Sequence, residues 1–132
     1  MNLIWATGVI TSFAIGAGAL AADGDAFDAV RRVLDDGGTV ACQSCDLSGA
    51  NLSLADLSGA DLAGANLSNT DLSGANLVGA NLANANLIGA NLISADLTEA
   101  DLSGANLSRA FIRATRICGT VMPDGRRDES GC

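Results

Sequence analysis

A leucine recurs at every fifth position through the centre of the chain, from Leu47 to Leu107. The series continues without a slip as Ile112, Ile117 and Met122, which makes sixteen units. A five-residue step turns an α-helix by roughly 500°, so the leucines would spread around a plain helix. On a flat strand the same odd step would put them on alternate faces. The period therefore predicts a solenoid, in which the chain turns a corner within each unit and points every central residue toward one axis.

The other positions of the unit have a chemistry of their own. Two residues before each centre stands a small residue, which is Ala in most units; the exceptions are Cys45, Thr70, Thr115 and Thr120. Asn or Asp directly precedes the centre as far as Asn106, Phe111 then takes that place, and Gly often stands two residues after the centre. We expect Leu to fill a dry interior beside Ala, with Asn, Asp and Gly forming the corners.

These units resemble the pentapeptide-repeat family, whose consensus is similar to Ala-Asn/Asp-Leu-x-x, and the resemblance covers residues 45–122. The closing segment ICGTVMPDGRRDESGC is similar to the end of many bacterial members. The resemblance implies an all-β solenoid, a right-handed quadrilateral β-helix with four pentapeptides in each coil. Sixteen units then make about four coils, a rod of roughly 20 Å.

The aspartates give independent support for four units in each coil. Between Asp46 and Asn106, no Asp at the position before the centre is followed by another Asp 20 residues later. Three units in each coil would instead stack Asp46 on Asp61 and Asp56 on Asp71. Stacked carboxylates would repel each other across the spacing between strands, so the pattern favours the square coil.

Residues 1–22 form an apolar run that ends in small residues, with Ala19-Leu20-Ala21 readable as a cleavage signal. We interpret this run as a secretory signal peptide, which leaves a mature chain from near Ala22 or Asp23. It has no Lys or Arg near Met1, and the run from residue 3 to residue 22 is just long enough to span a bilayer. An uncleaved anchor is therefore the alternative.

The segment 23–44 is predicted to be a capping helix followed by a linker. Its apolar residues follow helical spacing: Ala26, Phe27, Val30, Val33 and Leu34. Asp25 is a plausible N-cap, and Gly37 and Gly38 end the pattern. Such a helix would cover the exposed edge of the first coil, although it could also bind a partner. We expect the β-helix over residues 45–124 and a capping tail over residues 125–132.

The four cysteines lie near the two ends of the rod, Cys42 and Cys45 at the first and Cys118 and Cys132 at the second. Four cysteines allow three connectivities. Because the ends are further apart than the roughly 7 Å that a disulfide spans, end-to-end bridges are poor. This favours Cys118 with Cys132 and leaves Cys42 and Cys45 either bridged or simply packed. Disulfides would suit an exported protein.

Acidic and basic residues are unevenly distributed along the rod. The chain has 15 acidic and 7 basic residues, a net charge of −8, with no basic residue between Val33 and Ser108. The basic residues of the carboxy-terminal end are Arg109, Arg113, Arg116, Arg126 and Arg127. The chain has no His, Lys or Tyr, so no recognisable base could activate a serine. We expect no catalytic activity, no cofactor and no metal site.

These features favour a non-catalytic, exported rod, periplasmic or extracellular, that acts as a structural or protein-interaction module. The candidate contact patch consists of Val78, Ile88 and Ile93, which should project outward. We expect an unidentified protein partner, a monomeric rod, and neither a small-molecule substrate nor direct nucleic acid binding. Stable membrane association is not expected once the signal is removed.

The alternative is a DNA-mimicking modulator of type II topoisomerase, as some family members present an acidic rod. Those relatives tend to have longer arrays and Phe at many centres, whereas the thirteen centres from Leu47 to Leu107 are all Leu. An export signal would also separate the protein from the chromosome.

Overall fold

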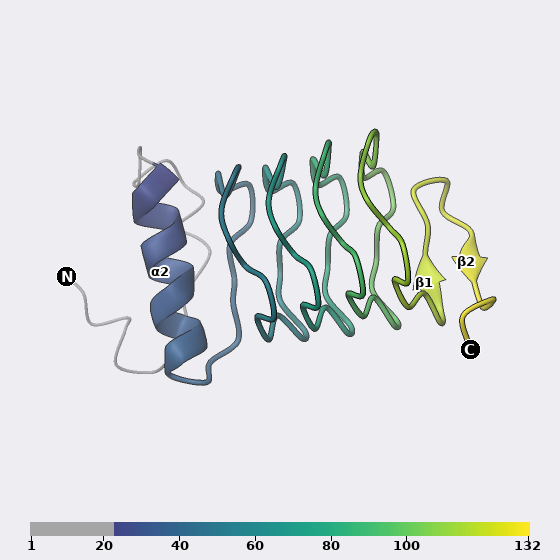
Figure 1. Cartoon of the computed structure of the whole chain (residues 1–132), viewed down its shortest axis with the longest axis horizontal. Coiled ribbons are helices and arrows are strands. Elements are labelled where there is room, and N and C mark those ends of the chain that lie inside the picture. Colours follow the sequence, from purple (N-terminus) through teal and green to yellow (C-terminus); the bar gives the residue numbers. More distant parts are fainter. Residues whose placement is uncertain (1–22) are drawn as a thin grey trace.

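The computed structural model describes residues 23–132, and the predicted signal peptide lies outside these residues. The helix α2 (Asp23–Asp35) stands at one end of the molecule, and the repeats follow it as stacked coils (Figure 1). At the other end β1 (Thr120–Val121) pairs with β2 (Arg127–Asp128) in an antiparallel hairpin. Within residues 23–132, no helix combines the length and the apolar character needed to cross a bilayer.

A register of 20 residues holds the coils together. Thirteen parallel bridges, from Ala41 with Asp61 to Asp101 with Val121, each join a residue to the one 20 positions later. The N–H of each central leucine from Leu47 to Leu102 donates to the next coil, as Leu47 does to the carbonyl of Asn66 at 2.8 Å. Twenty residues equal four units, so residues pair as the aspartate spacing predicts. Pairing begins at Ala41, ahead of residue 45 where we expected the first repeat.

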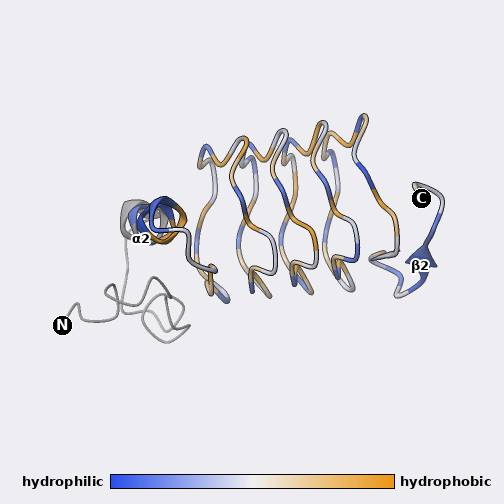
Figure 2. Cartoon of the chain, turned by 90° about the horizontal axis from the view of Figure 1, so that it is seen from below, coloured by the Kyte–Doolittle hydropathy of each residue, from blue (hydrophilic) through white to orange (hydrophobic). Residues whose placement is uncertain are grey.

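The interior is filled as the sequence predicts. The twelve central leucines from Leu47 to Leu102 are each at most 3% exposed, and most of the alanines beside them are buried as well. No buried side-chain nitrogen or oxygen in the described part of the chain lacks a hydrogen-bond partner. Hydrophobic and hydrophilic residues alternate along the walls of each coil (Figure 2). The leucine side chains therefore account for the core.

The threonines that replace alanine add hydrogen bonds to this core. Thr70 and Thr120 are fully buried, and their Oγ1 atoms donate to the carbonyls of Leu47 and Leu97 at 2.8 Å and 2.7 Å. Thr115 donates in the same way to a carbonyl 23 residues earlier, at 2.7 Å. A hydroxyl is thus tolerated beside the leucines because it bonds the backbone of the preceding coil.

One predicted core residue is placed differently. Ile112 continues the leucine series, yet it is 57% exposed, and Leu107 before it is only half-buried. Both belong to the last coil, and no further coil covers them. The prediction that Ile112 points into a closed interior is therefore wrong, because the repeat ends there.

The corners of the coils need a left-handed backbone two residues after each centre. Gly occupies many of these corners, but Leu54 has a φ of 61° and a side chain that is 81% exposed. A leucine in this conformation brings its Cβ too close to the following carbonyl oxygen, which costs roughly 1–2 kcal/mol. Leu54 is therefore a strained position that gains little from burial.

We expect Leu54→Gly to raise the free energy of unfolding by up to about 1 kcal/mol, because strain relief outweighs the added freedom of the unfolded chain. Gly59 occupies an equivalent corner with a φ of 67°, and a Cβ there would touch nothing within 4 Å. The matched control Gly59→Leu should lower the same free energy by about 1 kcal/mol. Urea denaturation of the three proteins measures both changes. A loss of stability in Leu54→Gly would show that Leu54 makes a stabilising contact.

Candidate functional site

The walls of the rod use their backbone fully, so only side chains are available for contacts. Val78, Ile88 and Ile93 each follow a core leucine, and each N–H donates to an Asn Oδ1 two residues earlier at 3.1 Å. Their carbonyls accept bonds from the preceding coil, as Ile88 does from Asn69 at 2.8 Å. Ile93 is 36% exposed, whereas Val78 and Ile88 are half-buried.

The register places these three residues on different walls. Ile88 and Ile93 lie on successive walls of one coil. The 20-residue stacking puts Ser68 and Ser73 beside them in the preceding coil, and Ser108 and Arg113 in the following one. Val78 lies two walls away from Ile88 by the same register. The structure thus keeps Ile88 and Ile93 as neighbours and separates Val78 from Ile88. Their use as a contact patch stays a prediction.

The aspartates on the walls act as turn acceptors. Oδ1 of Asp56 accepts the Ser58 hydroxyl at 2.7 Å and the Ser58 N–H at 3.1 Å, and Asp71 is bonded in the same way by Ser73. These hydrogen bonds lower the pKa of Asp56 and of Asp71 below the ordinary value for a carboxyl. The bond from the serine hydroxyl has the larger effect, and the bond from the serine N–H has the smaller one. Each carboxylate is therefore held ionised beside its own turn, which is unsuited to proton transfer near neutral pH.

Asp61 shows how the walls avoid stacked carboxylates. Its Oδ1 accepts a hydrogen bond from Nδ2 of Asn81, one coil later, at 3.3 Å. Its other oxygen accepts one from Nε2 of Gln43. The Asp-over-Asn arrangement expected from the sequence is present here, and it gives a neutral donor where a second Asp would repel.

A disulfide closes the first end of the rod. Cys42 and Cys45 are bridged with Cα atoms 5.5 Å apart, and both side chains are buried. Cys42 also occupies the place of a central leucine, five residues before Leu47, and its N–H donates to the carbonyl of Asp61 at 2.8 Å. Sequence reasoning missed this role, although the five-residue count carried back from Leu47 would have found it. The bridge is therefore part of the core.

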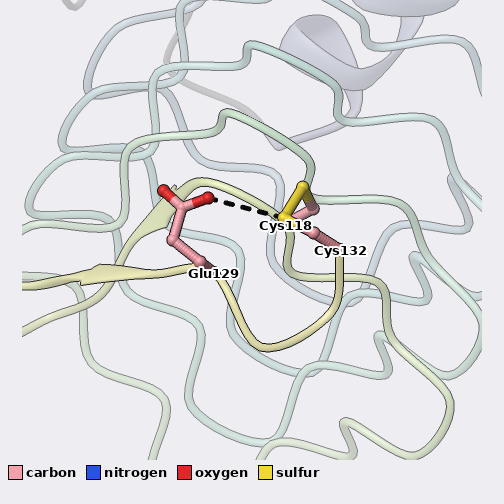
Figure 3. Close-up of side chains that lie close together, drawn as sticks. All are labelled: Cys118, Glu129 and Cys132. Atoms are coloured by element: carbon pink, nitrogen blue, oxygen red, sulfur yellow. Dashed lines mark hydrogen bonds between the residues drawn. A yellow bond between two sulfur atoms is a disulfide. The ribbon is translucent and has the colours of Figure 1, made fainter.

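A second disulfide holds the tail at the other end. Cys118 and Cys132 are bridged with Cα atoms 4.7 Å apart (Figure 3). Oε1 of Glu129 lies 3.4 Å from Sγ of Cys132, which is a contact only, since a bridged sulfur carries no hydrogen. These three residues lie close enough to share a metal ion. The bridge uses both thiolates, however, and leaves a single carboxylate ligand.

An ion pair also joins the tail to the coil of Glu99. Nη2 of Arg127 donates to Glu99 at 2.5 Å and its Nε to Glu129 at 2.7 Å. The hydrogen bonds to Glu129 and, with a smaller effect, to Glu99 raise the pKa of Arg127 above its ordinary value. Glu99 lies 28 residues before Arg127, and no repeat signal links them, so the sequence could not have revealed the pair.

A hollow lies beside this hairpin. It is an open depression of about 560 Å³ between Met122, Arg126 and Glu129. Nε of Arg126 pairs with Asp124 at 2.7 Å, and Arg127 pairs with Glu129. The remaining charged residue of the lining, Asp128, accepts the N–H of Ser130 at 2.8 Å. The hollow offers no group poised for chemistry beyond these pairs.

The chain is similar to known repeat proteins. The family model described as pentapeptide repeats matches residues 40–74 and 75–113, more than half of the chain, with eight copies. No curated protein sequence matches significantly.

Two solved structures from cyanobacteria are similar over most of the described residues. HetL of Nostoc sp. strain PCC 7120, a pentapeptide repeat protein involved in heterocyst differentiation regulation, is 37% identical over 67% of this chain, with a TM-score of 0.51. This chain covers 43% of HetL, less than half of its length. A second pentapeptide repeat protein from Nostoc PCC 7120 is 34% identical over 70% of this chain and 76% of its own, with a TM-score of 0.66.

Proposed function

Because the chain belongs to the pentapeptide repeat family, we propose that it is a non-catalytic, exported rod that binds a protein partner through its outer surface. Members fold as right-handed quadrilateral β-helices and are generally structural or interaction proteins. The observation that carries the proposal is the filled interior, in which the twelve leucines from Leu47 to Leu102 are at most 3% exposed. A solid core leaves the walls and the two ends for recognition.

The ends of the rod support a model of about four coils with a helical cap. Val30 and Val33 of α2 are buried, at 0% and 2% exposure, in the same cluster as Cys42 and Leu47. We propose that α2 covers the edge of the first coil, which would otherwise expose apolar core and unpaired backbone. A monomeric rod is consistent with this protection.

The disulfides support export. Two bridges, Cys42 with Cys45 and Cys118 with Cys132, persist in oxidising compartments and are rare in the cytosol. The apolar run of residues 1–22 supplies a matching signal in the sequence. We therefore place the protein in the periplasm or outside the cell.

The DNA-mimicking alternative has less support. Leucine fills every centre from 47 to 107, and the exposed Arg109 and Arg113 make one end of the rod basic, unlike duplex DNA.

The two adjacent walls that carry Ile88 and Ile93 are the surface on which we propose partner binding. Ile93 is exposed, and an apolar pair on successive walls gives a partner an anchor that the neighbouring Ser68 and Ser73 lack. The variant Ile88→Asp with Ile93→Asp places two charges there without touching the leucine core. The expected result is the loss of crosslinked complexes formed in intact cells from a photo-crosslinker at Ser73, the neighbour of Ile93.

The matched control is Ser48→Asp with Ser53→Asp, which adds the same charges to the same two walls two coils earlier. Complexes should survive in the control. Retention of the same crosslinked bands in the isoleucine variant, with the fold intact by circular dichroism, would remove these walls as the contact surface.

Export is tested by the intact mass of the non-reduced protein from each cell fraction. We expect the exported fraction to hold a chain that lacks residues 1–22 and is lighter by two hydrogens for each disulfide. A full-length, fully reduced chain confined to the cytoplasm would contradict the export proposal.

A further inference from the structure

The carboxy-terminal end of the core is uncovered. We use the term open end for Leu107, Arg109, Phe111, Ile112 and Arg113 of the last coil. Phe111 and Ile112 are 58% and 57% exposed, whereas the leucines one coil earlier are at most 2% exposed. A cavity of about 60 Å³ lies at this end and is lined by Leu107 and Ile112 together with Leu92, Ile117 and Met122. It is nearly all apolar and could hold the end of one apolar side chain.

The backbone of the open end is also unsatisfied. One coil earlier, the N–H groups of Leu87 and Leu92 donate to the carbonyls of Asn106 and Phe111 at 2.8 Å. The corresponding N–H groups of Leu107 and Ile112 donate to no acceptor among residues 23–132. The last coil therefore presents an edge to which another strand can add.

The tail covers the other side of this coil only. The N–H of Gly119 donates to the carbonyl of Asp128, and that of Met122 to Arg126, both at 2.8 Å. These bonds belong to the β1–β2 hairpin, in which β1 is part of the last coil and β2 lies outside it (Figure 1). The side formed by Leu107 and Ile112 receives no such strand.

The open end is positively charged, which favours an acidic partner. Arg109 and Arg113 are exposed, and neither forms an ion pair with any residue of the described chain. Arg116 nearby has only Asp96, with Nη1 3.9 Å from Oδ2. A second copy of the same end would bring like charges together, which disfavours association of two such ends. A segment that carries carboxylates would compensate both free arginines.

We propose that the open end binds an extended acidic segment of a partner protein, which adds a β-strand to the last coil. Its backbone would pair with the N–H groups of Leu107 and Ile112, its carboxylates with Arg109 and Arg113, and one apolar side chain would enter the cavity. This inference rests on the proposed function as an interaction rod, but it concerns the end of the rod and not the walls of Ile88 and Ile93.

The test is titration of the isotope-labelled, non-reduced protein with a capped eight-residue peptide that alternates aspartate with valine, followed by NMR. We expect the amide signals of Leu107 and Ile112 to shift and their hydrogen exchange to slow. Arg113→Glu should weaken binding about tenfold. The matched control Arg31→Glu, an exposed arginine of α2 at the opposite end, should change the affinity less than about twofold.

Four results would overturn the inference. The first is binding of a peptide with lysine in place of aspartate as tightly as the aspartate peptide. The second is a loss of affinity in Arg31→Glu equal to that in Arg113→Glu, and the third is the absence of any shift at Leu107 and Ile112. Dimerisation through this end, detected by sedimentation and abolished by Arg113→Glu, would also overturn it, because a second copy would then be the occupant. None of these results affects the crosslinks from the walls of Ile88 and Ile93, so failure here is distinguishable from failure of the proposed function.

Discussion

The hydrogen-bond ladder between residues 20 positions apart is the constraint on which the rest of the molecule depends. Each central leucine from Leu47 to Leu102 donates its N–H to the following coil, as Leu72 does to the carbonyl of Asn91 at 2.7 Å, and this pairing fixes which side chains face the axis. The leucines are buried because the ladder repeats in step with them. Burial of each contributes about 1.5–3 kcal/mol as an upper bound, offset by the entropy of ordering the chain.

A ladder of this kind leaves only the outer side chains and the two ends of the rod exposed. The backbone of the walls is hydrogen-bonded to neighbouring coils, and many Asp and Asn side chains are hydrogen-bonded to turns, so the residue after each leucine is free to vary. The two ends differ from each other. Val30 and Val33 of α2 lie in one buried cluster with Cys42 and Leu47, whereas Phe111 and Ile112 of the last coil stay exposed beside the hairpin and the Cys118–Cys132 bridge.

Much of this arrangement follows from the sequence alone because the repeat is so regular. The five-residue period predicts which residues are buried, and the spacing of Asp46, Asp56, Asp61 and Asp71 favours the 20-residue register that the bridges show. The length of a disulfide favours the pairing of Cys118 with Cys132, whereas it left Cys42 and Cys45 either bridged or simply packed. The leucine period and the Asp and Asn positions recur in unit after unit, so one sequence gives the same evidence for burial and register many times.

Most of the features that the sequence does not predict lie where the repeats end. No other segment of the chain repeats these residues, so the sequence offers no pattern from which to predict their structure. Ile112 keeps the repeat pattern but loses its cover, because its burial would require another coil stacked on the last one. The pair of Arg127 with Glu99 depends on how the tail folds back. Leu54 takes a left-handed corner because the ladder imposes that backbone on whichever residue occupies it.

Couplings across hydrogen bonds in the isotope-labelled protein measure the 20-residue register directly. We expect a coupling from the N–H of Leu72 to the carbonyl of Asn91, with equivalent couplings along the rod. A coupling from Leu72 to Asn86 would instead indicate three units in each coil. That result, or couplings only within helical turns, would contradict the square β-helix and every assignment of inward and outward residues.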